Sequence, residues 1–135
     1  MTIHHIGTLF LRIVLGVIFF VHGWDKFQSG IGNTVGFFES VGLPGFSAYV
    51  VAIIELIGGI AMILGLGTRI IAILFILIMA GAIVTVKGPA GFIDGYELDL
   101  ALLGMSVYIA LALPAPLSLD RFIFSKQPTT KNHPA

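Results

Sequence analysis

Long apolar runs, broken by short clusters of glycine, proline and charged residues, dominate the sequence. Four of them come close to the roughly 20 residues that an α-helix needs to cross about 30 Å of hydrocarbon. These runs cover residues 6–24, 46–66, 68–86 and 97–113. The third has no charge from Ile70 to Val86, whereas the fourth is free of charge only from Leu100 to Leu113. The pattern predicts an all-α integral membrane protein that forms a four-helix up-down bundle.

The segment between the first two runs predicts a short additional helix over residues 33–40. Asn33 is a favourable N-cap, and Pro44 follows the expected end of the helix. Val35 and Phe38 would share one apolar face, which suits an element lying at the membrane interface. We therefore expect a short interfacial helix between the first and second spans.

Composition supports lipid as the solvent. Of the 135 residues, 57% are apolar and only 10% are charged, whereas soluble domains carry roughly 25% charged residues. Seven basic and seven acidic residues cancel, and no basic cluster occurs, which argues against a nucleic-acid partner. Because there is no cysteine, the chain has no thiolate nucleophile, Cys-ligated zinc or iron–sulfur cluster of its own.

The distribution of Lys and Arg predicts the orientation in the membrane. One side of the bundle would hold Arg69, Arg121, Lys126 and Lys131, and the other side Lys26 and Lys87. We expect a multi-pass protein of the cell membrane with both termini in the cytoplasm. Residues 1–113 would form the membrane domain, and residues 114–135 a polar cytoplasmic tail.

Two charged residues lie well inside the predicted spans, away from their ends, where an unpaired charge costs at least about 2.5 kcal/mol. Counted from the cytoplasmic ends of their runs, Arg12 lies about 9 Å deep and Glu55 about 16 Å deep. We infer an ion pair between them, with a structural or a functional role. The alternative is that Arg12 extends to the headgroups while Glu55 is protonated or hydrogen-bonded.

A polar stripe follows the first run, with Arg12, Gly16, Phe19, Gly23 and Lys26 at helical spacing. Such a stripe is too polar to face lipid, so we expect it to face the bundle interior, with its glycines leaving space for a cavity. Further glycines in the second span favour close helix packing within one bundle, and a contact in a homo-oligomer is the alternative.

A candidate site follows at the outer end of the bundle. His22 lies beside the polar stripe and one turn before Lys26, and Glu97 begins a face that continues through Ala101, so all three are expected to point inward. Lys26 and His22 anchored at the interface are the alternative, and the helix dipole alone explains acidic residues in a first turn. Apolar walls with a few converging polar groups suit a flat lipophilic ligand. The candidate catalytic residues are His22, Lys26, Glu97 and Asp99, and the candidate ligand-binding residues are Trp24, Phe27, Phe38, Lys87 and Tyr96.

Common cofactor motifs are absent from the sequence. There is no GxGxxG after a strand, no Walker sequence and no HExxH, and His22 is the one histidine within or at the edge of a span. We therefore expect no metal site, and the sequence itself does not identify a cofactor.

Several short motifs, in order along successive spans, together resemble the DoxX family of small four-helix membrane proteins. They are LRI at 11–13, FVHGWDKF at 20–27, GLP at 42–44, ELIGG at 55–59, GLGTR at 65–69 and GYELDL at 95–100. The last motif and the chain length are similar to the CatD-type oxidoreductases of that family, which are associated with catechol and quinone stress. By matching position, the resemblance carries over Arg12, His22, Lys26, Glu55 and Glu97 as functional residues.

The resemblance implies a membrane protein linked to redox chemistry, since some relatives are subunits of oxidoreductase complexes. The leading hypothesis is a protein that handles quinone or catechol-type aromatic compounds together with a partner oxidoreductase, with a quinone such as menaquinone as the candidate cofactor or ligand. The alternatives are a non-enzymatic carrier for small aromatic compounds, and a membrane scaffold or assembly factor.

Overall fold

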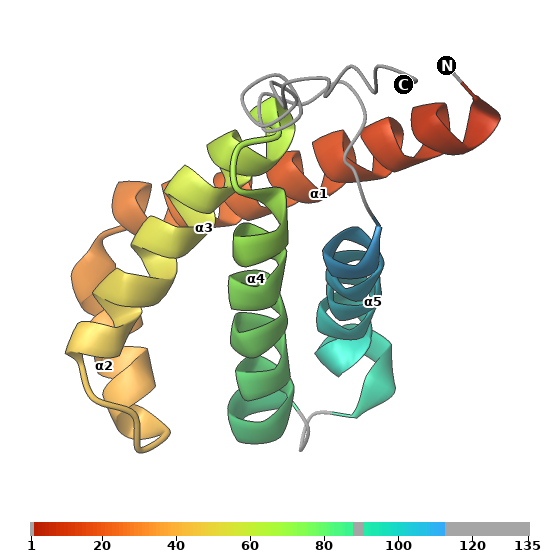
Figure 1. Cartoon of the computed structure of the whole chain (residues 1–135). Coiled ribbons are helices and arrows are strands. Elements are labelled where there is room, and N and C mark those ends of the chain that lie inside the picture. The colour runs from red at the N-terminus through yellow and green to blue at the C-terminus, as the bar shows by residue number, and fades with distance from the viewer. Residues whose placement is uncertain (1, 88–90, 113–135) are drawn as a thin grey trace, which may run out of the picture.

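The computed structural model describes residues 2–87 and 91–112, in which all regular secondary structure is helical. The expected tail at 114–135 lies outside the described residues. Five α-helices follow one another, with two short π-helical segments between the last two (Figure 1). They are α1 (Ile3–Gln28), α2 (Ile31–Ser40), α3 (Phe46–Leu64), α4 (Thr68–Ala82), η1 (Ile83–Lys87), η3 (Phe92–Tyr96) and α5 (Glu97–Leu111).

Each of the four apolar runs forms a helix, and α2 confirms that a short helix lies between the first two. It begins at Ile31 with Gly30 at the N-cap position, so the expected start with Asn33 as the N-cap is wrong. Three stretches are long and apolar enough to cross a membrane, namely Ile3–Gln28, Phe46–Leu64 and Thr68–Thr85. The 15 residues of α5 extend only about 22 Å, which is less than the hydrocarbon thickness of a typical bilayer. The all-helical membrane architecture is thus confirmed, with three clear candidate spans among the described residues.

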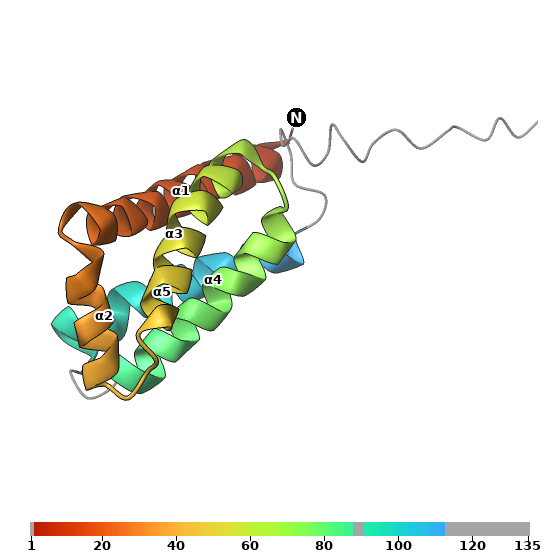
Figure 2. The same cartoon turned by 90° about the vertical axis from the view of Figure 1, so that its left-hand side faces the viewer.

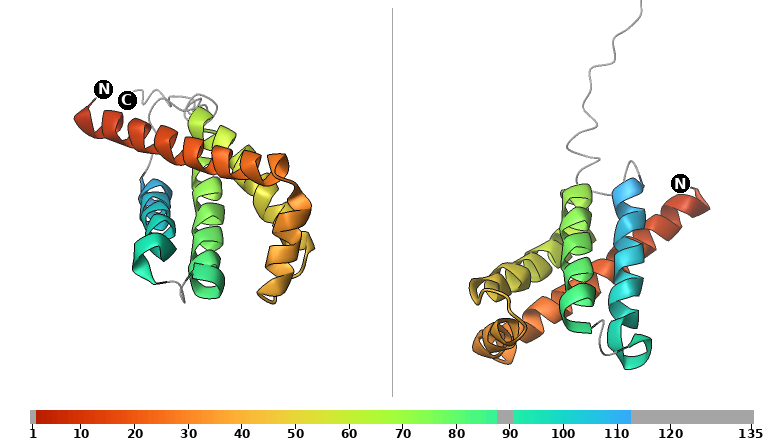
Figure 3. Two further views of the ribbon diagram at one scale, coloured as in Figure 1. Left: turned by 180° about the vertical axis from the view of Figure 1, so that it is seen from behind. Right: turned by 90° about the horizontal axis from the view of Figure 1, so that it is seen from below.

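The long helices are arranged as two pairs. Helix α1 packs mainly on α3, and α4 packs mainly on α5. Seen from below, the two pairs cross each other, and α1 lies across the ends of α4 and α5 (Figures 1 and 3). At that crossing the hydroxyl groups of Thr8 and Tyr108 lie 3.1 Å apart and join α1 to α5. A second view shows α2 beside α3 at the other end of α1 (Figure 2).

The core lies where the two pairs meet. The rings of Phe19 on α1 and Phe75 on α4 stack with centroids 3.6 Å apart and an interplanar angle of 5°. Other fully or nearly fully buried apolar side chains surround this stack, among them Leu15, Met62, Ala72, Leu102 and Ile109. Aromatic stacking and close packing therefore hold the α1–α3 pair against the α4–α5 pair.

Glycines bring the α1 and α3 backbones into direct contact. A Cβ at Gly16 would lie 2.7 Å from the carbonyl oxygen of Gly59, and one at Gly23 would lie 2.6 Å from the backbone nitrogen of Leu56. The expected cavity beside these two glycines is therefore wrong, because the α3 backbone fills the space. Gly58 likewise touches the Phe75 ring, which confirms that these glycines pack helices within one chain.

A tight turn joins α3 to α4, as the glycines at 65 and 67 predict. Both adopt positive φ, 77° at Gly65 and 56° at Gly67, a conformation that costs glycine little. The backbone N–H of Leu66 donates to the carbonyl of Ala61 at 2.8 Å, a bond that satisfies one of the free carbonyls at the end of α3. The turn thus reverses the chain within a few residues.

Candidate functional site

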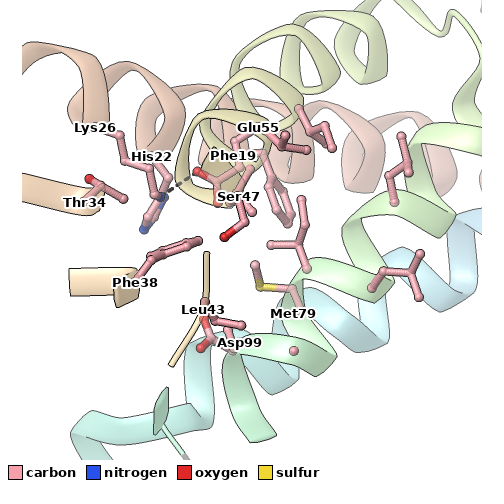
Figure 4. A pocket seen from close by; sticks show the side chains of 18 of the residues that line it. Phe19, His22, Lys26, Thr34, Phe38, Leu43, Ser47, Glu55, Met79 and Asp99 are labelled. Atoms are coloured by element: carbon pink, nitrogen blue, oxygen red, sulfur yellow. Dashed lines mark hydrogen bonds and ion pairs between the residues drawn. The ribbon is translucent and has the colours of Figure 1, made fainter. Parts of the chain in front are cut away.

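A cavity of about 700 Å³ lies between the two helix pairs. Its walls come from α1, α2 and α3 on one side and from α4 and α5 on the other (Figure 4). Most of the lining is apolar and includes the aromatic side chains of Phe19, Phe37 and Phe38. The volume lies in the range of small-molecule sites, which are commonly apolar with a few polar groups. The charged and other polar lining residues are His22, Asp25, Lys26, Asn33, Thr34, Ser47, Glu55, Thr85 and Asp99.

An ion pair occupies one side of this cavity. The Lys26 Nζ atom donates a hydrogen bond to the Oε2 atom of Glu55 at 2.7 Å, and this bond joins α1 to α3. Their side chains are 21% and 5% exposed, respectively. A buried charge in an apolar surrounding is tolerated when it is paired and hydrogen-bonded, so Lys26 accounts for the position of Glu55 inside α3.

Glu55 pairs with Lys26, and the expected pair with Arg12 is therefore wrong. The backbone contacts of Gly16 with Gly59 and of Gly23 with Leu56 set the register of the two helices. That register places Arg12 about 15 Å from Glu55 along the helix axis, beyond the reach of an arginine side chain. The depths counted from the sequence assume that the N-terminal end of the first span and the C-terminal end of the second lie at the same level. In the structure the N-terminal end of α1 extends beyond the C-terminal end of α3. Arg12 itself is 1% exposed, within the α1 face that packs on the bundle.

The remainder of the polar stripe on α1 faces the interior, as predicted. Gly16, Phe19 and Gly23 are buried, and Lys26 reaches the cavity. His22 is exposed at the cavity wall, and its Nδ1 atom lies 2.8 Å from the carbonyl oxygen of Ile18. A carbonyl oxygen only accepts hydrogen bonds, so Nδ1 directs its proton to Ile18 and Nε2 is the ring nitrogen left to face a ligand.

On α5 the structure separates the two predicted acidic residues. Asp99 lines the cavity and is 6% exposed, whereas Glu97 is exposed and accepts a hydrogen bond from the backbone N–H of Asp94 at 3.3 Å. The expectation that Glu97 and Ala101 point inward is therefore wrong. The buried face instead carries Asp99, Leu102, Ser106 and Ile109. Apolar side chains of α5 itself point to every side of the helix, so the sequence pattern did not define which face would be buried.

Of the predicted aromatic residues, some line the cavity and others do not. Phe38 lines the cavity, whereas Trp24, Phe27 and Tyr96 are not among the lining residues. Trp24 stacks on Phe20 of its own helix, with ring centroids 6.2 Å apart. The side chain of Lys87 lies outside the described part of the structure.

Several polar lining residues were not predicted. Thr34 on α2, Ser47 on α3 and Thr85 in η1 all contribute to the wall, as do Asp25 and Asn33. The four-residue spacing of Thr34 and Phe38 placed them on one helical face, which was a usable signal for α2. The hydroxyl residues near helix ends gave no such signal, because local capping explains them equally well.

The fold and the cavity define a class, a helical membrane protein with several apolar helices and a polar-lined pocket between them. Within that class, the DoxX family model matches residues 7–88, and the chain belongs to the DoxX family.

Relatives of this chain include membrane proteins of several bacteria. It is 53% identical over 119 residues to the "Putative oxidoreductase CatD" of Bacillus subtilis, with 88% of each chain covered. It is 31% identical to the "Uncharacterized membrane protein Rv3486" of Mycobacterium tuberculosis, over 82% of this chain and 77% of that protein. It is 29% identical to the "Inner membrane protein YqjF" of Escherichia coli, over 90% and 95%. No solved structure matches the chain.

Proposed function

We propose that this protein binds a quinone- or catechol-type aromatic compound in the cavity between its helix pairs and serves a membrane redox pathway together with a partner oxidoreductase. The cavity of about 700 Å³, apolar except for a few polar groups that include the Lys26–Glu55 pair, carries this proposal. The name of one relative, "Putative oxidoreductase CatD", agrees with a redox role.

The side chains around the cavity suit the chemistry of such a ligand. Phe37 and Phe38 offer flat apolar surfaces to an aromatic ring. Lys26 uses one of its three N–H donors on Glu55, which leaves two for a ligand oxygen. Interconversion of a quinone and its hydroquinone moves two protons and two electrons. His22 and Asp99 are groups able to exchange the protons, and the partner oxidoreductase would exchange the electrons.

The same proposal includes the membrane topology. We place α5, together with η3 before it, as the fourth span, and both termini on the cytoplasmic side, as the distribution of Lys and Arg suggests. Residues 1–113 would then be the membrane domain. The short α2 would lie near the outer surface, where it closes one end of the cavity.

Filling the cavity tests the proposal. Thr34→Trp places an indole in the wall, whereas Ser40→Trp on the same helix adds it at an exposed position outside the cavity. We expect Thr34→Trp to weaken binding of 1,4-naphthoquinone and catechol at least tenfold, and Ser40→Trp to bind like the unaltered protein. Equilibrium dialysis of protein in lipid nanodiscs measures both. Equal binding by the two variants, or no binding of any redox form, contradicts the proposal.

Two further measurements distinguish the alternative functions. Counterflow of labelled catechol in proteoliposomes, with no change in its absorbance spectrum, would identify a carrier. A stoichiometric partner that co-purifies with the chain, combined with no ligand affinity, would identify a scaffold.

A further inference from the structure

The cavity wall is rich in hydrogen-bond acceptors. Three carboxylates, those of Asp25, Glu55 and Asp99, line it, and an ionised carboxylate only accepts hydrogen bonds. Among the described lining residues, Lys26 is the one cationic side chain of the Lys or Arg type. One of its three donors already belongs to Glu55.

Three neutral polar side chains of the wall have their own protons engaged in hydrogen bonds to backbone carbonyls. The Nδ1 proton of His22 is held by the carbonyl of Ile18, so it is not available to a ligand. The hydroxyl of Ser47 donates to the carbonyl of Pro44, and the hydroxyl of Thr85 donates to the carbonyl of Gly81 at 2.7 Å. Both hydroxyl oxygens then keep lone pairs but have no proton left to give. Among the described lining residues, the donors left for a ligand are two N–H groups of Lys26, one amide N–H of Asn33 and the hydroxyl of Thr34, and the acceptors of the three carboxylates and the other hydroxyl oxygens outnumber them.

The two redox forms of the proposed ligand differ in whether they can donate hydrogen bonds. The carbonyl oxygens of a quinone only accept hydrogen bonds, whereas each hydroxyl group of a hydroquinone or catechol also donates one. We infer that the cavity binds the reduced, dihydroxy form in preference to the quinone, and that Asp99 determines this preference. The inference rests on the proposed function, since it names which form of the aromatic ligand the same site takes.

Asp99 is singled out by its position. It belongs to α5, in the helix pair opposite Lys26 and Glu55, and Figure 4 shows it on the other side of the pocket from both. A diol that lies across the cavity would place one hydroxyl group near Glu55 and the other near Asp99. A carboxylate has about four lone-pair positions, so Asp99 can accept a ligand hydroxyl beside its existing interactions. Hydrogen bonds to an ionised carboxylate are about twice as strong as neutral ones.

The charges of the wall favour an uncharged diol. Among the described lining residues, three carboxylates face one ammonium group, a balance that disfavours an anion such as a catecholate. A neutral dihydroxyarene is the form that meets the acceptors without this repulsion.

Three ligands with the same two-ring skeleton and oxygen positions test the inference on the unaltered protein. They are 1,4-dihydroxynaphthalene, 1,4-naphthoquinone and 1,4-dimethoxynaphthalene, the last of which retains both oxygens but cannot donate. Binding is measured in oxygen-free buffer by equilibrium dialysis with nanodiscs, and protein-free nanodiscs correct for partition into lipid. We expect the diol to bind at least tenfold more tightly than the other two.

The outcomes separate this inference from the proposed function. Quinone binding equal to or tighter than diol binding overturns the preference, while binding in the cavity stands. If none of the three ligands binds, the proposed function fails as well.

Asp99→Asn tests the assigned residue, because the amide keeps the size and removes the charge. We expect it to lower diol affinity about tenfold without lowering quinone affinity, because the amide N–H can donate to a quinone oxygen, whereas Glu39→Gln, at an exposed position outside the cavity, changes neither. Circular dichroism verifies the fold, and Asp99→Ser provides a second neutral variant. A full diol preference in Asp99→Asn overturns the role of Asp99.

Discussion

Glu55 lies in the middle of an apolar helix, and its partner reaches it from the last turn of α1. The Lys26 side chain is long enough to keep part of its stem at the cavity edge while its ammonium group meets the carboxylate at 2.7 Å. The residue types alone indicated that Glu55 needs a cation, since an isolated charge is costly in lipid. Which cation supplies it depends on helix register, and this selects Lys26 over Arg12.

A double-mutant cycle measures this pairing. Lys26→Met leaves the buried carboxylate unpaired and is expected to lower stability by about 2 kcal/mol. Adding Glu55→Gln to that variant should recover about 1 kcal/mol, because the two changes are coupled. Thermal unfolding in detergent micelles provides the stabilities. Arg12→Met and Glu55→Gln should be additive within about 0.5 kcal/mol. A larger coupling for Arg12 than for Lys26 would refute the pairing described here.

Individual helices owe their packing to a few small residues. Gly16 and Gly59 face each other across α1 and α3, and each would place a Cβ within 2.7 Å of the other's carbonyl oxygen. The glycine spacing predicted close helix packing, but the sequence did not show which helix would fill the space. On α5, by contrast, apolar residues lie on every side, and only contacts with the other helices determine that Asp99 rather than Glu97 is buried.

Alanine substitutions on one helix test the close contact. Gly16→Ala is expected to destabilise the protein by about 2 kcal/mol, because the new methyl group meets backbone atoms that cannot rotate away. Gly7→Ala, on the same helix with nothing within 4 Å of its Cβ position, should be neutral or stabilising by up to about 1 kcal/mol. Thermal unfolding of the two variants gives the comparison. Equal effects would mean that helix propensity, and not the α1–α3 contact, explains Gly16.

At the scale of the molecule, the four longer helices of the described residues form two pairs that cross, and the crossing creates the cavity. The pairs meet at the Phe19–Phe75 stack, and the Thr8–Tyr108 contact joins them at the other end of α1. Between the stack and α2 the pairs diverge, and there the polar side chains of α1, α3 and α5 come together. The site is thus a property of the arrangement of helices, and no single helix carries it.

Single cysteines test the topology, because the natural sequence contains none. We expect Ile3→Cys and Ala112→Cys to react with a membrane-impermeant maleimide in inside-out vesicles, and Ser29→Cys to react in intact cells. Mass tagging followed by electrophoresis measures the labelling. Labelling of Ala112→Cys on the same side as Ser29→Cys would show that α5 does not cross the membrane.

The sequence by itself determined the helices, their approximate ends, the short α2 and the buried stripe on α1. These features depend on local chemistry, namely apolar length, glycine and proline at the breaks, and helical periodicity. Tertiary structure alone decided the partner of Glu55, the buried face of α5 and the position of the cavity. Each of these depends on how far one helix is shifted and rotated against another, and contacts between residues distant in the chain fix that relation.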